Sequence, residues 1–178
     1  MDLAGFGLFF VIFLRLTVPL LIFRWPLWGT LASAVVDALD TNLVKPFGAE
    51  IPHYVQVDKV LDLYYLSIAF YVSLKWENKL AKRTSIFLYV WRLVGVILFE
   101  LSGIRYLLFI FPNLFENFFI FFEVLRKLKK DSWISNYKRL GLAVFLLWLL
   151  KVPQELILHV YQVGTPVETF YAWLKSLF

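Results

Sequence analysis

Six long apolar stretches constrain the fold of this chain more than any other feature of its sequence. They cover residues 3–23, 27–43, 55–74, 85–101, 104–125 and 140–161. A helix of about 20 mostly apolar residues is long enough to cross the hydrocarbon core of a bilayer. Hydrophobic residues make up 61% of the chain, against about 45–50% in a soluble domain. We therefore predict an all-α integral membrane protein, a six-transmembrane-helix bundle formed by a single domain.

The last 14 residues show a different pattern. Thr165, Pro166 and Glu168 match a capping box with proline at the first helical position. Apolar residues then recur at helical spacing up to Phe178. We predict that residues 1–164 form the bundle and that residues 165–178 form a short amphipathic helix in the membrane interface.

Basic residues concentrate in two loops between the apolar stretches, at residues 75–83 and 126–139. Short basic loops of membrane proteins face the cytoplasm. We therefore predict that both loops are cytoplasmic and that the loop between Asp37 and Asp62 lies outside, in a bacterial inner membrane. The net charge of +5 is explained by these loops, so we expect membrane lipids as partners and no nucleic acid.

Four aspartates form the most distinctive polar group: Asp37 and Asp40 lie three residues apart, and Asp58 and Asp62 four apart. Each pair falls on one face of a helix, and prolines and a glycine between the pairs permit a chain reversal. Four carboxylates brought together repel unless a proton or a cation neutralises them. Oxygen ligands suit Mg²⁺ or Mn²⁺, whereas the absence of cysteine excludes a thiolate site. We predict a divalent-metal site on these four residues.

The spacing of the four aspartates resembles the signature of the CDP-alcohol phosphatidyltransferase family, D-x2-D-G-x2-A-R-x8-G-x3-D-x3-D. The chain departs from the signature elsewhere: its glycines are replaced by Thr41 and Tyr54, and Ala-Arg by Val44-Lys45. The resemblance covers about the first third of the chain at residue level.

The resemblance implies a transferase of phospholipid metabolism in which Asp37, Asp40, Asp58 and Asp62 hold the metal. It further implies that Asp62 deprotonates the acceptor alcohol as the catalytic base and that Lys45 binds phosphate. Because the family acts on a cytosolic CDP-linked lipid, the predicted outside location of the Asp37–Asp62 loop conflicts with this activity.

A second polar group lies deeper in the apolar stretches. Arg92 and Glu116 fall at compatible depths in the fourth and fifth stretches, and an ion pair would neutralise two charges that are costly in a membrane. We predict that they form a structural pair. His53 in the loop and His159 near Glu155 are expected to be solvated or interfacial side chains.

Two functional hypotheses remain open. The chain is either a divergent phosphatidyltransferase-like enzyme with a carboxylate metal site or a non-catalytic integral membrane subunit. The subunit would form a homodimer or join a larger membrane complex, binding lipid, pigment or partner helices through its aromatic runs. The intact aspartate spacing favours the enzyme, and the lost glycines favour the subunit.

Overall fold

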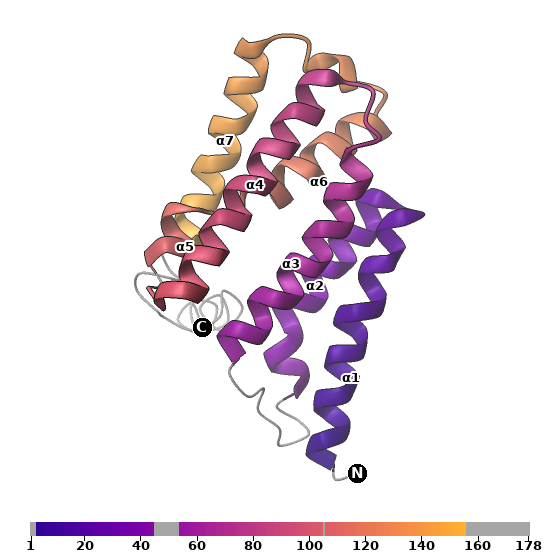
Figure 1. The fold of residues 1–178 in the computed structure, drawn as a ribbon. Helices are drawn as coiled ribbons and strands as arrows, with labels where there is room; N and C mark the ends of the chain where they lie inside the picture. Colours follow the sequence, from indigo (N-terminus) through magenta and orange to yellow (C-terminus); the bar gives the residue numbers. More distant parts are fainter. Residues whose placement is uncertain (1–2, 45–53, 105, 156–178) are drawn as a thin grey trace, which may run out of the picture. The chain divides into compact units, whose positions relative to one another are not determined.

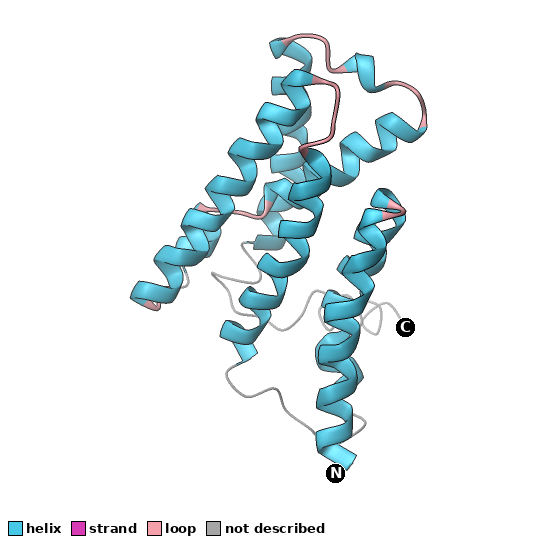
Figure 2. Ribbon diagram, turned by 45° about the vertical axis from the view of Figure 1, so that its right-hand side comes forward, coloured by secondary structure: helices cyan, strands magenta, loops and turns pink. Residues whose placement is uncertain are grey.

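The computed structural model describes residues 3–44, 54–104 and 106–155, and every regular element in these ranges is helical (Figures 1 and 2). The all-α fold class is confirmed for this part of the chain. The elements are α1 (Leu3–Thr17), η1 (Val18–Phe23), α2 (Pro26–Val44), α3 (Tyr54–Ser73), α4 (Lys79–Ser102), α5 (Tyr106–Ile110), α6 (Leu114–Lys127), η3 (Asp131–Trp133) and α7 (Tyr137–Glu155).

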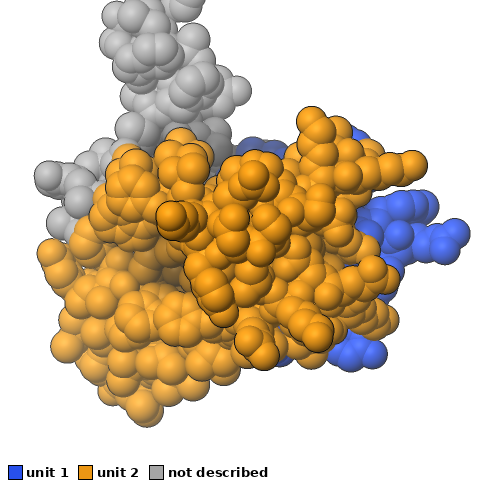
Figure 3. All heavy atoms as spheres, turned by 90° about the horizontal axis from the view of Figure 1, so that it is seen from above, with its two compact units in different colours: residues 1–72 blue, residues 73–178 orange. Residues whose placement is uncertain are grey.

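The chain divides into two compact units, coloured separately in Figure 3. Unit 1 is Met1–Val72 and contains α1, η1, α2 and nearly all of α3; unit 2 is Ser73–Phe178 and contains the remaining helices. The sequence predicts one domain, whereas the structure groups the helices into two units, and we describe each by itself.

In unit 1, α1 continues into the 3-10 helix η1, and the chain then reverses into α2. The turn is closed by backbone hydrogen bonds, with the amide of Trp25 donating to the carbonyl of Leu21 at 2.8 Å. Gly29 allows α2 to pack closely on η1, because a Cβ at this position would lie 2.4 Å from the backbone nitrogen of Ile22. The two helices therefore approach at a distance that only glycine permits.

In unit 2, a buried tryptophan organises the packing of α6. Trp76 is 1% exposed, and its ring lies 4.4 Å from that of Phe122 and 5.4 Å from that of Phe119. Its indole nitrogen donates a hydrogen bond to Glu123 at 2.7 Å. The only buried carboxylate that the structure describes in α6 is thereby paired, as a buried polar group requires.

Three helical stretches are long and apolar enough to span a membrane: Gly5–Phe23, Lys79–Ser102 and Tyr106–Lys127. Large apolar side chains face outward from these and neighbouring helices, for example Phe9 at 61% exposure and Phe87 at 62%. Many large apolar side chains exposed on apolar helices of this length are typical of contact with lipid. The chain is therefore described as a membrane protein.

The predicted fifth stretch corresponds to the candidate span Tyr106–Lys127, but the structure divides it into two helices. Residues 104–125 do not form one helix: α5 ends at Ile110 and α6 begins at Leu114. Pro112 stands in the break, where its ring and its missing N–H prevent a continuous helix. The second, third and fourth predicted stretches do form helices α2, α3 and α4. The predicted helix at 165–178 lies outside the described residues.

Candidate functional site

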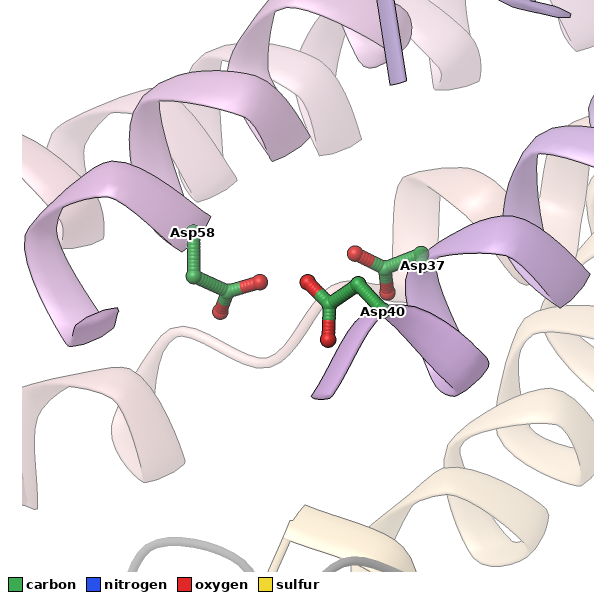
Figure 4. A group of neighbouring side chains, drawn as sticks. All are labelled: Asp37, Asp40 and Asp58. Atoms are coloured by element: carbon green, nitrogen blue, oxygen red, sulfur yellow. The ribbon is translucent and has the colours of Figure 1, made fainter. Parts of the chain in front are cut away.

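The four aspartates of the sequence signature come together in unit 1. Asp37 and Asp40 lie on α2, and Asp58 and Asp62 lie on α3. Figure 4 shows Asp37, Asp40 and Asp58 with their carboxylates directed toward one another. The spacing of three and four residues therefore places both pairs on facing sides of two helices, as expected from helix geometry.

The guanidinium of Arg15, on α1, forms hydrogen bonds with all four carboxylates. Its Nη1 atom donates to Asp40 at 2.5 Å and to Asp58 at 2.9 Å. Its Nη2 atom donates to Asp62 at 3.0 Å and also to Asp37. A planar guanidinium with several fixed donors is suited to this arrangement, so one side chain links α1 to both acidic helices.

A second cation lies against the two aspartates of α3. The Nζ atom of Lys59 donates to Asp58 at 2.6 Å and to Asp62 at 3.1 Å. Asp58 and Asp62 are therefore shared between Arg15 and Lys59. We call these six residues, Arg15, Asp37, Asp40, Asp58, Lys59 and Asp62, the charge cluster.

Most of the charge cluster is removed from solvent. The exposed fraction is 5% for Arg15, 1% for Asp40, 7% for Asp62 and 8% for Lys59. Buried charges are tolerated only when they are paired and hydrogen-bonded. The cluster satisfies this condition, and its side chains hold one another in fixed positions.

Three of the carboxylates have a geometry compatible with a metal ion. Asp37, Asp40 and Asp58 each offer one oxygen, and these three oxygens lie within 4.8 Å of one another. Two oxygens on opposite sides of a hard cation, each about 2.0–2.6 Å from it, lie about 4–5 Å apart. These residues therefore fit a divalent cation, and a small hollow lined by Leu14, Ser33 and Tyr65 lies beside Asp37.

Sequence reasoning missed the two cations of the charge cluster. The local sequence assigns Arg15 no role, because its partners lie 22 to 47 residues away in the chain. The available signal was the high cost of one arginine in an apolar span, which requires carboxylate partners. Lys59, between Asp58 and Asp62 in the sequence, had a local signal in its i, i+3 spacing to Asp62.

The predicted ion pair between Arg92 and Glu116 is wrong. Arg92 is buried, but its Nη1 atom donates to the carbonyl of Phe111 at 3.0 Å. Glu116 instead accepts a hydrogen bond from the side chain of Asn113 at 2.8 Å. The break between α5 and α6 explains the change, because it frees the Phe111 carbonyl and makes Asn113 the N-cap of α6.

Lys45, predicted to bind phosphate, lies outside the described residues, as do His53 and His159. The catalytic role of Asp62 stays a prediction; the structure places this side chain beside Arg15 and Lys59.

Comparison of the chain with protein-family models, with curated proteins and with solved structures gives no match.

Proposed function

We propose that this chain is an integral membrane protein whose charge cluster binds a divalent cation, Mg²⁺ or Mn²⁺, on a scaffold like that of the CDP-alcohol phosphatidyltransferases. The observation that carries the proposal is the 4.8 Å grouping of carboxylate oxygens from Asp37, Asp40 and Asp58. A cation at this site would share or replace the contacts that Arg15 makes with the same four carboxylates.

In this proposal Asp37, Asp40 and Asp58 hold the cation, and Asp62 completes the acidic set from the next turn of α3. A bound divalent ion would polarise a phosphate group and stabilise negative charge that develops on it. Asp62 would accept the proton of an acceptor alcohol. Lys45, at the arginine position of the signature, would place its positive charge against phosphate. The donor would be a CDP-linked lipid and the acceptor an alcohol, as the family resemblance implies.

The direct test is thermal unfolding of the purified protein in detergent, with Mg²⁺, with Mn²⁺ and with chelator. A cation that binds only the folded protein raises its stability by mass action, by about 2.7 kcal/mol at a hundredfold excess over the dissociation constant. Asp58→Asn should abolish this rise. The matched control is Asp131→Asn, the same substitution in η3 of unit 2, which should keep the rise.

Transferase chemistry requires a second measurement. Turnover of a CDP-linked lipid that depends on the cation and is lost in Asp62→Asn would support the enzyme. Stabilisation by the cation without turnover would leave a metal-binding scaffold without this reaction. No response of the melting temperature to either cation would refute the metal site and with it the enzyme.

A second candidate function is favoured by one specific observation. The guanidinium of Arg15 contacts every carboxylate of the cluster, so a positive charge is already present where a metal would be needed. In this reading the charge cluster is a structural core that joins three helices. The chain would then be a non-catalytic membrane subunit that associates with a second copy or with a larger complex through its exposed aromatic surface.

We propose that the helices form six spans, with α2, α3 and α7 completing the set and α5 with α6 forming one broken span. The basic loops would be cytoplasmic and the loop between Asp37 and Asp62 outside, in a bacterial inner membrane. Because the chain contains no cysteine, a single cysteine can be introduced at position 49 or 79 and its labelling tested with a reagent that stays outside intact cells. We expect labelling at 49 and protection at 79, which would favour a metal-binding scaffold without transferase activity, because the CDP-linked lipid is cytosolic. The opposite pattern would place the aspartates at the cytosolic face and favour the transferase.

A further inference from the structure

The two basic loops of unit 2 meet at one end of its helices, the upper end of unit 2 in Figure 1. Asn78, which precedes α4, joins them directly. Its side-chain nitrogen donates to the carbonyl of Asp131 at 3.1 Å and to the carbonyl of Ile134 at 2.8 Å. These bonds hold residues 75–83 against residues 126–139, and we call the combined surface the basic end.

The basic end carries a large excess of exposed positive charge. Residues 75–83 contain four cations and one acid, and residues 126–139 contain six cations and one acid. Nine of these ten cations are exposed: Lys75, Lys79, Arg83, Arg126, Lys127, Lys129, Lys130, Lys138 and Arg139. One of these cations, Arg126, is paired with the buried carboxylate of Glu123, which also accepts a hydrogen bond from Trp76. The other nine cations, against two acids on one surface, attract anions.

Two helix N-termini add to this positive field. Helices α4 and α7 both begin at the basic end. Asn78 caps α4 by accepting from the amide of Ala81 at 3.0 Å, and Asn136 accepts from the amide of Arg139 at 3.0 Å. The N-terminus of a helix carries a partial positive charge and favours anions such as phosphate. Helix dipoles and side chains therefore act in the same direction.

The helices next to the basic end expose an apolar surface. Phe87 on α4 is 62% exposed, and Phe145 and Trp148 on α7 are 55% and 42% exposed. Tyr137, the first residue of α7, is 73% exposed, and tyrosine is enriched at the level of the lipid headgroups. Apolar helix faces that end in a tyrosine and several cations follow the order of layers in a bilayer, from acyl chains to headgroups.

We infer that the basic end binds the phosphate groups of anionic membrane lipids. A soluble polyanion would need only the charge, whereas this surface continues directly into side chains suited to acyl chains. Each lysine or arginine near an anionic lipid surface contributes about 1 kcal/mol, which is about a fivefold change in affinity. Several cations contribute to binding at once, because each is attracted to the same anionic lipid surface.

The test uses the full-length protein in zwitterionic detergent micelles, titrated with phosphatidylglycerol while the melting temperature is measured. The variant Lys79→Gln/Lys130→Gln/Lys138→Gln removes three exposed cations from three parts of the basic end. We expect the phosphatidylglycerol concentration for half of the melting shift to rise roughly a hundredfold. Without lipid the variant should melt within about 2 °C of the wild type, since exposed substitutions change stability little.

The matched control replaces the same three lysines by arginine, which keeps the charges, and should keep the response to phosphatidylglycerol. Phosphatidylcholine and inorganic phosphate at equal concentration should give little shift. An unchanged phosphatidylglycerol response in the glutamine variant would overturn the inference. So would an equal shift with phosphatidylcholine, with inorganic phosphate or with a short single-stranded RNA, because each would show that anionic lipid is not the ligand selected.

Discussion

Replacing Arg15 by glutamine tests the charge cluster most directly. Glutamine keeps part of the side-chain length and some hydrogen-bonding capacity, but it removes the positive charge that four carboxylates share. The aspartates of α2 and α3 would then face one another without the group that lies between them. We expect a large loss of stability, because breaking a buried ion pair leaves an uncompensated buried charge.

The magnitude follows from the burial of each partner. The side chains of Arg15 and Asp40 are 4% and 1% exposed, and that of Asp62 is 9% exposed. Removing one partner of such buried pairs costs about 3–5 kcal/mol. The Asp37 side chain is 33% exposed, so solvent screens that contact and it adds well under about 1 kcal/mol. For a chain of this length each kcal/mol lowers the melting temperature by about 2–4 °C, which gives a fall of roughly 6–20 °C.

The assay is thermal unfolding in detergent, with Arg24→Gln as the matched control. Arg24 is exposed, lies in the same unit and receives the same substitution, so its variant should stay within about 0.5 kcal/mol of the wild type. An equal loss in both variants, or a change below about 2 °C in Arg15→Gln, would refute the argument that Arg15 holds the cluster together.

The same variant separates the two candidate functions. If the carboxylates bind a divalent cation, Mg²⁺ should restore part of the stability that Arg15→Gln loses, because the ion takes over the neutralising role. If the cluster is only a structural core, Mg²⁺ should leave the wild type unchanged, because Arg15 already neutralises its carboxylates. A response of the wild type to Mg²⁺ that equals that of the variant would show that Arg15 and the ion do not compete.

Two further predictions concern unit 2. Gly95→Ala should destabilise the protein by about 1–3 kcal/mol through overpacking, because the new Cβ would lie 2.2 Å from the Cβ of Phe111. In the control Gly141→Ala the new Cβ has nothing within 4 Å, so this variant should be neutral or stabilising in thermal unfolding. Equal effects of the two substitutions would refute the close packing. Trp76→Phe should lower the free energy of unfolding by about 1–3 kcal/mol, because it leaves the buried carboxylate of Glu123 without the indole donor. The double variant with Glu123→Leu should recover part of this loss in thermal unfolding, whereas additive losses would contradict the pairing.

Several helices were predictable because their ends are marked by charge or by proline. The predicted stretch 27–43 corresponds to α2, and 55–74 corresponds to α3, each within a residue at either end. The fifth stretch was predicted as one helix because its apolar residues are continuous, although Pro112 marks the break in the sequence. Apolar content measures the preference for lipid, but it carries no information on where the backbone hydrogen bonds of a helix stop.

The site was predictable only in part. The two aspartate pairs could be placed on helix faces from their spacing, since that is a local property. The role of Arg15 depends on contacts across 22 to 47 residues, and its cost in an apolar span indicates that it needs carboxylate partners without identifying them. The pairing of Arg92 was likewise set by the break after α5, which determines the carbonyl that accepts from its guanidinium.

The charge cluster has a consequence for how the nascent chain enters a membrane. The stretch Gly5–Phe23 is apolar enough to insert on its own despite Arg15, but α2 and α3 are not among the stretches apolar enough to do so. Each carries two aspartates, and each such charge at the centre of a span opposes insertion by about 2.5–3.5 kcal/mol. In the six-span arrangement proposed above, Arg15 would be synthesised first and would be the partner for the carboxylates that follow. Insertion of α2 and α3 would then depend on a residue that left the ribosome 22 to 47 residues earlier.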